Sequence, residues 1–247
     1  MLQLIGFDGD DTLWHSEDYY QQANAAFASI VGQYVDLADG RVQSDMLATE
    51  RRNLALFGYG AKGMTLSMVE TAIAITDRRI SARDIHRIVE LGKAVLQHPV
   101  ELLPGMREAV EQVAAAYAVV LITKGDLFHQ EKKVAQSGLA DLFQRIEIVS
   151  EKDAKTYRRV LDEFKLEPAQ FAMIGNSLRS DIEPVLRLGG WGVHLPYHVT
   201  WAHEQENGLG NDERRLISVA APAEVPAAVA ELAQRAASSS ASAGAIR

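Results

Sequence analysis

Residues 2–12 read LQLIGFDGDDT, and this stretch decides the fold. Its first half is apolar, and three carboxylates then follow closely, at Asp8, Asp10 and Asp11. A short apolar run that ends in turn-forming residues is typical of a strand buried on both faces. Groups that directly follow such a strand lie at the carboxyl edge of a parallel sheet, where ligands bind. We therefore predict a buried first strand that carries Asp8 to a ligand site.

Further apolar runs predict more strands of the same sheet. They lie at residues 118–123, 146–150, 171–176 and 191–195. Segments with apolar residues at helical spacing accompany them, at residues 106–117, 130–137, 157–164 and 181–188. Strands that alternate with helices predict an α/β fold, in which helices cover both faces of a parallel sheet.

The segment between the first two strands has a different pattern. Helix starts are expected at Ser16, Ser44 and Ser81, and an apolar stripe at helical spacing follows each of them. Because no strand pattern interrupts these stripes, we predict an inserted all-helical domain. The expected parts are a core of residues 1–14 and 99–236, a helical domain of residues 15–98, and a flexible tail of residues 237–247.

The composition is that of a soluble globular protein, and it excludes several classes. The 247 residues include 33 acidic and 25 basic side chains, for a net charge of −8. This acidic balance argues against nucleic acid or an anionic membrane as a partner. Cysteine is absent, which excludes disulfides and thiolate chemistry. With no targeting signal or membrane-length apolar segment in the sequence, we expect a cytoplasmic protein, and the oligomeric state stays open.

Polar side chains follow four of the predicted strands. They are Asp8 and Asp10 after the first strand, Thr123 and Lys124 after the second, Lys152 and Lys155 after the third, and Asn176 and Asp181 after the fourth. Covalent phosphoryl transfer needs such a set, with a carboxylate nucleophile, an acid/base and donors for the phosphoryl oxygens. Several carboxylates in one place also need a cation to offset their repulsion. Oxygen ligands favour Mg²⁺ over zinc.

In order and spacing, these groups resemble the motifs of the haloacid dehalogenase superfamily. The matching segments are residues 7–13, Ile122-Thr123, a lysine after the third strand, and Gly175-Asn176 with Asp181. The resemblance implies a Rossmann-like three-layer core with a parallel sheet. It also implies that the helical domain inserted after the first motif is a cap domain.

The resemblance assigns roles residue by residue. Asp8 would be the nucleophile that forms an aspartyl-phosphate, and Asp10 would protonate the leaving group and then activate water. Thr123 would hydrogen-bond a phosphoryl oxygen, and a lysine would hold Asp8 and the phosphoryl charge. Asp8, the backbone carbonyl of Asp10, Asn176 and Asp181 would bind Mg²⁺, with Asp11 nearby. Because dehalogenating members lack a carboxylate at the position of Asp10, the resemblance implies a phosphatase for a small phosphorylated metabolite.

Two parts of this assignment stay open. Position 176 is Asn where the phosphatase pattern usually has Asp, so either Asn176 or Asp181 could be the direct metal ligand. Lys152 lies just beyond the third strand and is favoured as the catalytic lysine. Lys155, at the start of the next helix, is the alternative.

Two further lysines are candidates for binding the substrate, and either could instead face solvent. Lys124 follows Thr123, and Lys62 lies in the segment GYGAKG of residues 58–63. This segment matches a dinucleotide-binding pattern, but it follows a helical stretch, whereas that motif must follow a strand. We therefore expect a loop of the helical domain.

Other functions remain compatible with the same residues. A phosphomutase and a haloacid dehalogenase-type hydrolase belong to the same superfamily. A receiver module also holds an aspartyl-phosphate at strand ends, but it would be much shorter and would lack the helical insertion. A binding protein without turnover is the fourth alternative, and Asn176 is the reason to consider it.

Overall fold

The computed structural model describes residues 1–38, 40–199, 201 and 214–244. The chain separates into two compact units. The sheet unit comprises residues 1–17, 100–124 and 131–247, and the helical unit comprises residues 18–99 and 125–130.

In the described part of the sheet unit, six parallel strands form one sheet in the order β3-β2-β1-β4-β5-β6. Their bounds are β1 Leu4–Phe7, β2 Ala118–Lys124, β3 Arg145–Val149, β4 Phe171–Gly175, β5 Trp191–His194 and β6 Leu216–Ser218. The central strand β1 pairs with β2 and β4, so that Phe7 lies opposite Leu121 and Ile174. This register brings the carboxyl ends of three neighbouring strands to one edge of the sheet.

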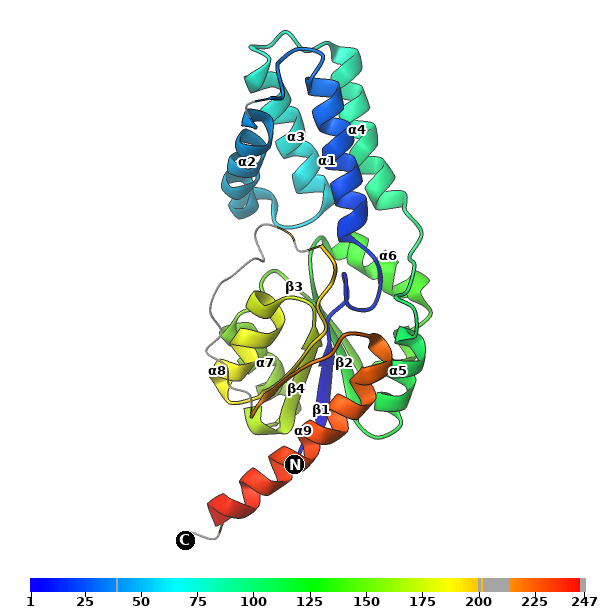
Figure 1. Ribbon diagram of the computed structural model, residues 1–247, viewed down its shortest axis with the longest axis vertical. Helices are drawn as coiled ribbons and strands as arrows, with labels where there is room; N and C mark the ends of the chain where they lie inside the picture. Colours follow the sequence, from blue (N-terminus) through cyan, green and yellow to red (C-terminus); the bar gives the residue numbers. More distant parts are fainter. Residues whose placement is uncertain (39, 200, 202–213, 245–247) are drawn as a thin grey trace. The chain divides into compact units, whose positions relative to one another are not determined.

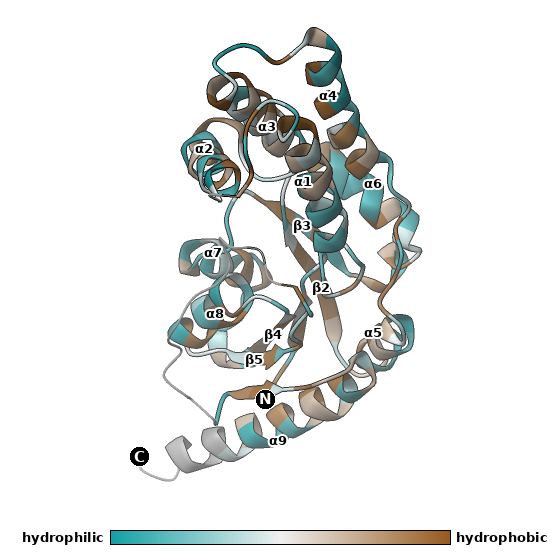
Figure 2. Ribbon diagram, turned by 45° about the horizontal axis from the view of Figure 1, so that its top comes forward, coloured by the Kyte–Doolittle hydropathy of each residue, from teal (hydrophilic) through white to brown (hydrophobic). Residues whose placement is uncertain are grey.

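Helices cover both faces of this sheet (Figure 1). On one face, β1, β2, β4 and β5 pack against α5 (Met106–Ala114), α6 (Leu127–Ser137) and α9 (Val225–Gly244) through one apolar cluster. On the other face, a second cluster joins the sheet to α7 (Ala154–Phe164) and α8 (Glu183–Leu188). Figure 2 shows that the buried strands and the covering helices differ in hydropathy: β2 is largely apolar, whereas the outer side of α7 is polar. The predicted α/β fold with a covered parallel sheet is confirmed.

The five predicted strands occur within two residues of their expected bounds, whereas the sixth strand, β6, was not predicted. Strand β6 has only three residues, none of them fully buried, so it lacks the apolar run that marks the others. Helix α9 continues to Gly244, through residues expected to form a flexible tail. Short helices complete the unit: η1 Ala140–Leu142, η2 Pro168–Gln170, the π-helical turn η3 Leu178–Ile182 and η4 Pro222–Glu224.

The helical unit contains α1 (Glu17–Val31), α2 (Arg41–Phe57), α3 (Ala61–Ile75) and α4 (Ala82–Gln97), and its described part has no strand. These helices enclose an apolar cluster of their own. Ser81 caps α4 as predicted, because its hydroxyl accepts the backbone N–H of Asp84 at 3.1 Å. Helix α2, however, begins at Arg41 rather than at Ser44. The reason is that Gly40 adopts a left-handed conformation before it, and the Ser44 hydroxyl donates to the carbonyl of Arg41 inside the helix.

No helix in the described part of the chain is both long enough and apolar enough to cross a membrane.

Candidate active site

The loop after β1 folds tightly at the carboxyl edge of the sheet. The backbone N–H of Asp8 donates to Ile174 at 2.9 Å, which continues the pairing with β4, and Leu13 then closes a turn onto the carbonyl of Gly9 at 2.8 Å. A side chain at Gly9 would not fit, because a Cβ there would lie 2.9 Å from Trp14 Cζ2 and 3.0 Å from Thr123 Oγ1. The close packing at Gly9 therefore holds the Thr123 hydroxyl, at the end of β2, beside the residue that follows Asp8.

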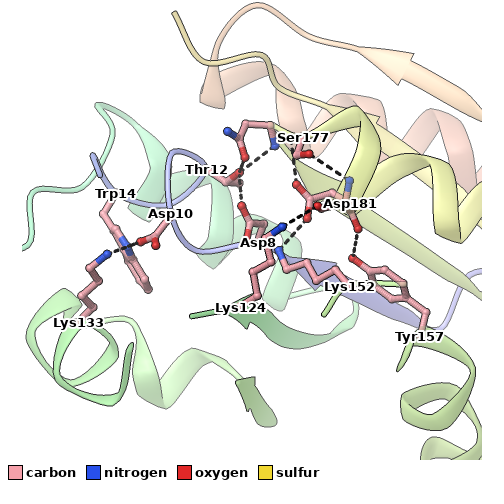
Figure 3. A network of polar contacts seen from close by, with 12 residues as sticks. Asp8, Asp10, Thr12, Trp14, Lys124, Lys133, Lys152, Tyr157, Ser177 and Asp181 are labelled. Atoms are coloured by element: carbon pink, nitrogen blue, oxygen red, sulfur yellow. Dashed lines mark hydrogen bonds and ion pairs between the residues drawn. The ribbon is translucent and has the colours of Figure 1, made fainter. Parts of the chain in front are cut away.

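Asp8, Lys152 and Asp181 form the centre of the site (Figure 3). Lys152 Nζ donates to Asp8 Oδ1, and it also donates to Asp181 Oδ1 at 2.7 Å. All three residues are buried. Burial and the neighbouring Asp181 raise the pKa of Asp8, and the ammonium of Lys152 offsets only part of this. Burial alone would lower the pKa of Lys152, but Asp181 and Asp8 outweigh it and keep the lysine protonated.

Local structure explains why Lys152, rather than Lys155, reaches the carboxylates. Lys152 precedes Asp153, whose carboxylate caps α7 by accepting the backbone N–H of Thr156 at 2.8 Å. Lys155 comes after this cap, in the first turn of the helix, where it is exposed.

Asp181 is held by a turn that follows β4. Its Oδ2 accepts the backbone N–H of Ser177 at 3.0 Å, while its Oδ1 accepts from Lys152. The carboxylate lies so close to β4 that a Cβ at Gly175 would be 2.2 Å from Asp181 Oδ2. Glycine at position 175 is therefore a requirement of the site, because any side chain there would displace Asp181.

Thr12 connects the nucleophile candidate with Asn176. Its hydroxyl lies 3.1 Å from Asp8 Oδ2 and 3.4 Å from Asn176 Oδ1, and it accepts the backbone N–H of Asn176 at 3.0 Å. One hydroxyl has one proton, so it can satisfy only one of the two oxygens at a time. Asp8 Oδ2 and Asn176 Oδ1 therefore share the Thr12 hydroxyl as a donor, whereas Lys152 Nζ bonds the other oxygen of Asp8.

Asp10 has a separate set of partners. Its Oδ1 accepts from Trp14 Nε1 at 2.6 Å and from Lys133 Nζ at 2.7 Å, as the left side of Figure 3 shows. Lys133 lies on α6 and also donates to the Ser16 hydroxyl at 3.1 Å.

The Asp11 carboxylate points to the start of α1. Its carboxylate accepts the backbone N–H groups of Ser16 and Glu17 at 2.9 Å each, at the start of α1. Burial, followed by the charge of Asp10, raises the pKa of Asp11 to about 8. Asp11 therefore caps the start of α1, a role that the sequence suggested for Ser16.

The two candidate substrate lysines lie in different units. Lys124 is in the sheet unit and donates to Ser180 Oγ at 2.9 Å, next to the turn that holds Asp181. Lys62 is in the helical unit and forms an ion pair with Asp126, with Nζ 2.9 Å from both carboxylate oxygens. Of the two, Lys124 thus belongs to the same unit as the central carboxylates.

Several residues that support the site were not predicted from the sequence. Tyr157 of α7 donates from its hydroxyl to the carbonyl of Ser180 at 3.0 Å, which fixes the turn before Asp181. Thr12 lies inside the first motif, and the only signal for it was an oxygen-bearing side chain four residues after Asp8. Lys133 has no such signal, because it lies in an ordinary amphipathic helix.

The donors fit a hard divalent cation. Asp8 and Asp181 bring two buried carboxylates to the ammonium of Lys152. Among the described residues, no three aspartate, glutamate or histidine side chains group closely enough to hold a metal by themselves. An ion at this edge would therefore also need amide and backbone oxygens, such as Asn176 Oδ1 near Asp8 Oδ2. An all-oxygen set of this kind suits Mg²⁺.

Comparisons with known proteins agree with this arrangement. A family model described as haloacid dehalogenase-like hydrolase matches residues 2–189. The crystal structure of a haloacid dehalogenase-like family hydrolase from Xanthomonas campestris is 59% identical. The match covers 96% of this chain and 94% of that one, with a TM-score of 0.85.

Two more distant structures share the fold. A predicted phosphoglycolate phosphatase from Haemophilus somnus is 18% identical, with 91% of this chain and 96% of that one covered and a TM-score of 0.59. A 2-haloacid dehalogenase from Pseudomonas syringae is also 18% identical, with 93% and 99% covered and a TM-score of 0.60. No protein of curated function matches the sequence.

Proposed function

Because the chain belongs to the haloacid dehalogenase-like hydrolases, we propose that it is a magnesium-dependent phosphatase. It would hydrolyse a small phosphorylated metabolite through an aspartyl-phosphate on Asp8. The observation that carries this proposal is the buried group of Asp8, Lys152 and Asp181, in which the Lys152 ammonium pairs with both carboxylates. Asp10, two residues after the nucleophile, supplies the second carboxylate that phosphoryl transfer to water requires.

The first half of the reaction transfers the phosphoryl group to the protein. A carboxylate oxygen of Asp8 attacks phosphorus, a new P–O bond forms, and the bond from phosphorus to the substrate oxygen breaks. Asp10 gives a proton to that oxygen, so the product leaves as an alcohol. Lys152 and the Thr123 hydroxyl donate to phosphoryl oxygens, where negative charge must be stabilised.

The second half returns Asp8 to its original state. Asp10, now a carboxylate, takes a proton from water, and the water oxygen attacks phosphorus. The bond between phosphorus and the Asp8 oxygen breaks, and inorganic phosphate leaves. Asp8 is a carboxylate again, and Asp10 carries the proton needed for the next turnover.

The residues that would hold Mg²⁺ are the Asp8 carboxylate, the Asp10 backbone carbonyl, Asn176 and Asp181. When bound, Mg²⁺ neutralises charge on the carboxylates and on the phosphoryl oxygens. Asp181 already uses both oxygens, on Lys152 and on Ser177. Asn176 Oδ1 lies close to the Thr12 hydroxyl that contacts Asp8 Oδ2, which favours the amide as a direct ligand.

The substrate would be a small phosphate ester, not a nucleic acid or a membrane lipid. Lys124 is the best candidate for a further contact with its anionic groups, because Ser180 holds the Lys124 ammonium at the sheet edge. We propose that the helical unit acts as a cap that selects the leaving group. Lys62 would contribute to selection only after release from Asp126.

The direct test is hydrolysis of p-nitrophenyl phosphate with Mg²⁺ by the wild-type protein and by Asp8→Asn. We expect turnover by the wild type, none by Asp8→Asn, and normal turnover by the control Asp141→Asn, which changes an exposed aspartate. Release of halide from a 2-haloacid without added Mg²⁺ would instead identify a dehalogenase. Absence of phosphatase activity in the wild type would overturn the proposal.

A further inference from the structure

Tyr157 connects helix α7 with the turn that holds Asp181. Its hydroxyl donates to the backbone carbonyl of Ser180 at 3.0 Å, as the right side of Figure 3 shows. Ser180 directly precedes Asp181, and Tyr157 lies five residues after Lys152. Lys152 Nζ and Asp181 Oδ1 form an ion pair at 2.7 Å. The Tyr157 hydroxyl therefore joins the two segments of the chain that carry the two charges of this pair.

The ring of Tyr157 is fixed by the core around it. Tyr157 is fully buried, and its ring centroid lies 6.2 Å from that of Phe171, at the start of β4. A phenylalanine would fill the same space without burying a hydroxyl, which is costly unless the hydroxyl is hydrogen-bonded. Packing thus makes the Tyr157 hydroxyl a donor whose position is set relative to β4.

Helix α7 is also held firmly on the sheet. Tyr157, Val160 and Leu161 belong to the apolar cluster on this face of the sheet. Arg159 adds an ion pair with Glu147 of β3, with Nη2 2.9 Å from Oε2. The helix is therefore a firm support for the hydroxyl and for the lysine that precedes it.

The local sequence explains why a side chain serves the carbonyl of Ser180. In an α-helix, a carbonyl accepts the backbone N–H of the residue four positions later. Four positions after Ser180 is Pro184, which has no N–H to donate. The turn η3 also has the wider π-helical pattern, in which the N–H of Ile182 donates to the carbonyl of Ser177 at 3.3 Å. Tyr157 thus supplies a donor where the backbone cannot supply the usual one.

We propose that Tyr157 is a positioning residue that sets the distance between Lys152 and Asp181, an inference that rests on the proposed phosphatase function. By holding the carbonyl of Ser180, it fixes the turn that presents the Asp181 carboxylate. The same helix fixes the start of α7, which presents Lys152. Tyr157 acts through these two residues and does not itself touch the substrate.

The test uses Tyr157→Phe, which removes the hydroxyl and keeps the ring. Isothermal titration calorimetry with Mg²⁺ alone measures the Kd of the protein without substrate, and kcat for p-nitrophenyl phosphate is measured at saturating Mg²⁺. Because Asp181 belongs to the proposed ligand set, we expect the Kd for Mg²⁺ to rise about 10-fold and kcat to fall about 10-fold. Losses of about this size accompany the removal of groups that orient metal ligands.

Tyr34→Phe is the matched control. It removes a tyrosine hydroxyl that donates to Asp84 Oδ2 at 2.5 Å, in the helical unit. We expect this variant to lose stability but to keep the wild-type Kd for Mg²⁺ and the wild-type kcat. Urea unfolding of both variants gives the fraction of folded protein, so a loss of folded protein is separated from a change in the site.

The outcomes are distinguishable. An unchanged Kd for Mg²⁺ in folded Tyr157→Phe overturns the positioning role, because Asp181 has then not moved, while the phosphatase function stands. A Tyr157→Phe variant that does not fold also overturns it, because the hydroxyl is then a requirement of the fold. If the wild type binds Mg²⁺ but hydrolyses no phosphate ester, the proposed function fails and the Kd values still decide the role of Tyr157. If the wild type does neither, both proposals fail.

Discussion

Replacing Gly175 by alanine should damage the site through a single steric contact. The added Cβ would lie 2.2 Å from Asp181 Oδ2 and 2.3 Å from Asp181 Cγ, whereas ordinary contact begins at 3.4 Å. Strand β4 is paired with β1 on one side and β5 on the other, so its backbone is held in place. To reach ordinary contact distance, Asp181 must therefore move by about 1.2 Å. A shift of this size breaks or lengthens the bonds from Lys152 and Ser177.

The expected cost has two components. Overpacking a buried position destabilises a protein by about 1–3 kcal/mol. Misplacing a catalytic group by about 1 Å lowers the rate by about 10²-fold. Urea unfolding would measure the first, and Mg²⁺-dependent hydrolysis of p-nitrophenyl phosphate by the folded variant would measure the second.

Gly6→Ala is the matched control. Its Cβ would meet Met173 Sδ and Phe171 Cζ at 2.8 Å, so it overpacks the apolar core near β1 without touching Asp181. We expect it to lose stability but to keep kcat/KM. If folded Gly175→Ala hydrolysed the substrate as fast as the wild type, the placement of Asp181 in the catalytic site would be refuted.

Three more predictions follow from the same geometry. Lys152→Met should lower kcat by at least about 10²-fold, because it removes the donor on Asp8, whereas Lys155→Met should not; equal losses would contradict this assignment. Asn176→Asp should reduce the Mg²⁺ concentration needed for half-maximal activity, since it adds a charge to the proposed ligand set; an unchanged requirement would exclude the amide as a ligand. In the helical unit, burial raises the pKa of Glu50 to about 7, above its usual value of 4.5. Folding then favours the protonated form of Glu50, so the free energy of unfolding should fall as pH rises from 4.5 to 7. Urea unfolding of Glu50→Gln should show a smaller fall over this range. An equal fall in the variant and the wild type would contradict the raised pKa.

The sequence was sufficient for the parts of the fold that depend on local pattern. The inner strands are continuous apolar runs, and Asp8 follows the first of them directly, so its place at the sheet edge could be predicted. Strand β6 could not be found in this way, because three partly exposed residues carry no such pattern. Its position depends on pairing with β5 instead.

The site shows the same limit. The choice between Lys152 and Lys155 depends on where α7 begins, and Asp153 sets that start through its bond to Thr156. The contact between Lys133 and Asp10 joins residues that are 123 positions apart in the sequence, and no sequence motif predicts it. Contacts of this kind are a product of tertiary packing and are not encoded in any short spacing.

The central claim is that Asp8 becomes phosphorylated and that water then rapidly removes the phosphoryl group from Asp8. Rapid acid quenching during turnover of p-nitrophenyl phosphate with Mg²⁺, followed by mass spectrometry of the peptide that contains Asp8, tests it most directly. The account predicts a phosphorylated Asp8 peptide that forms within one turnover and disappears as soon as substrate is exhausted. Phosphate that persists on Asp8, or turnover without any phosphorylated Asp8, would contradict it.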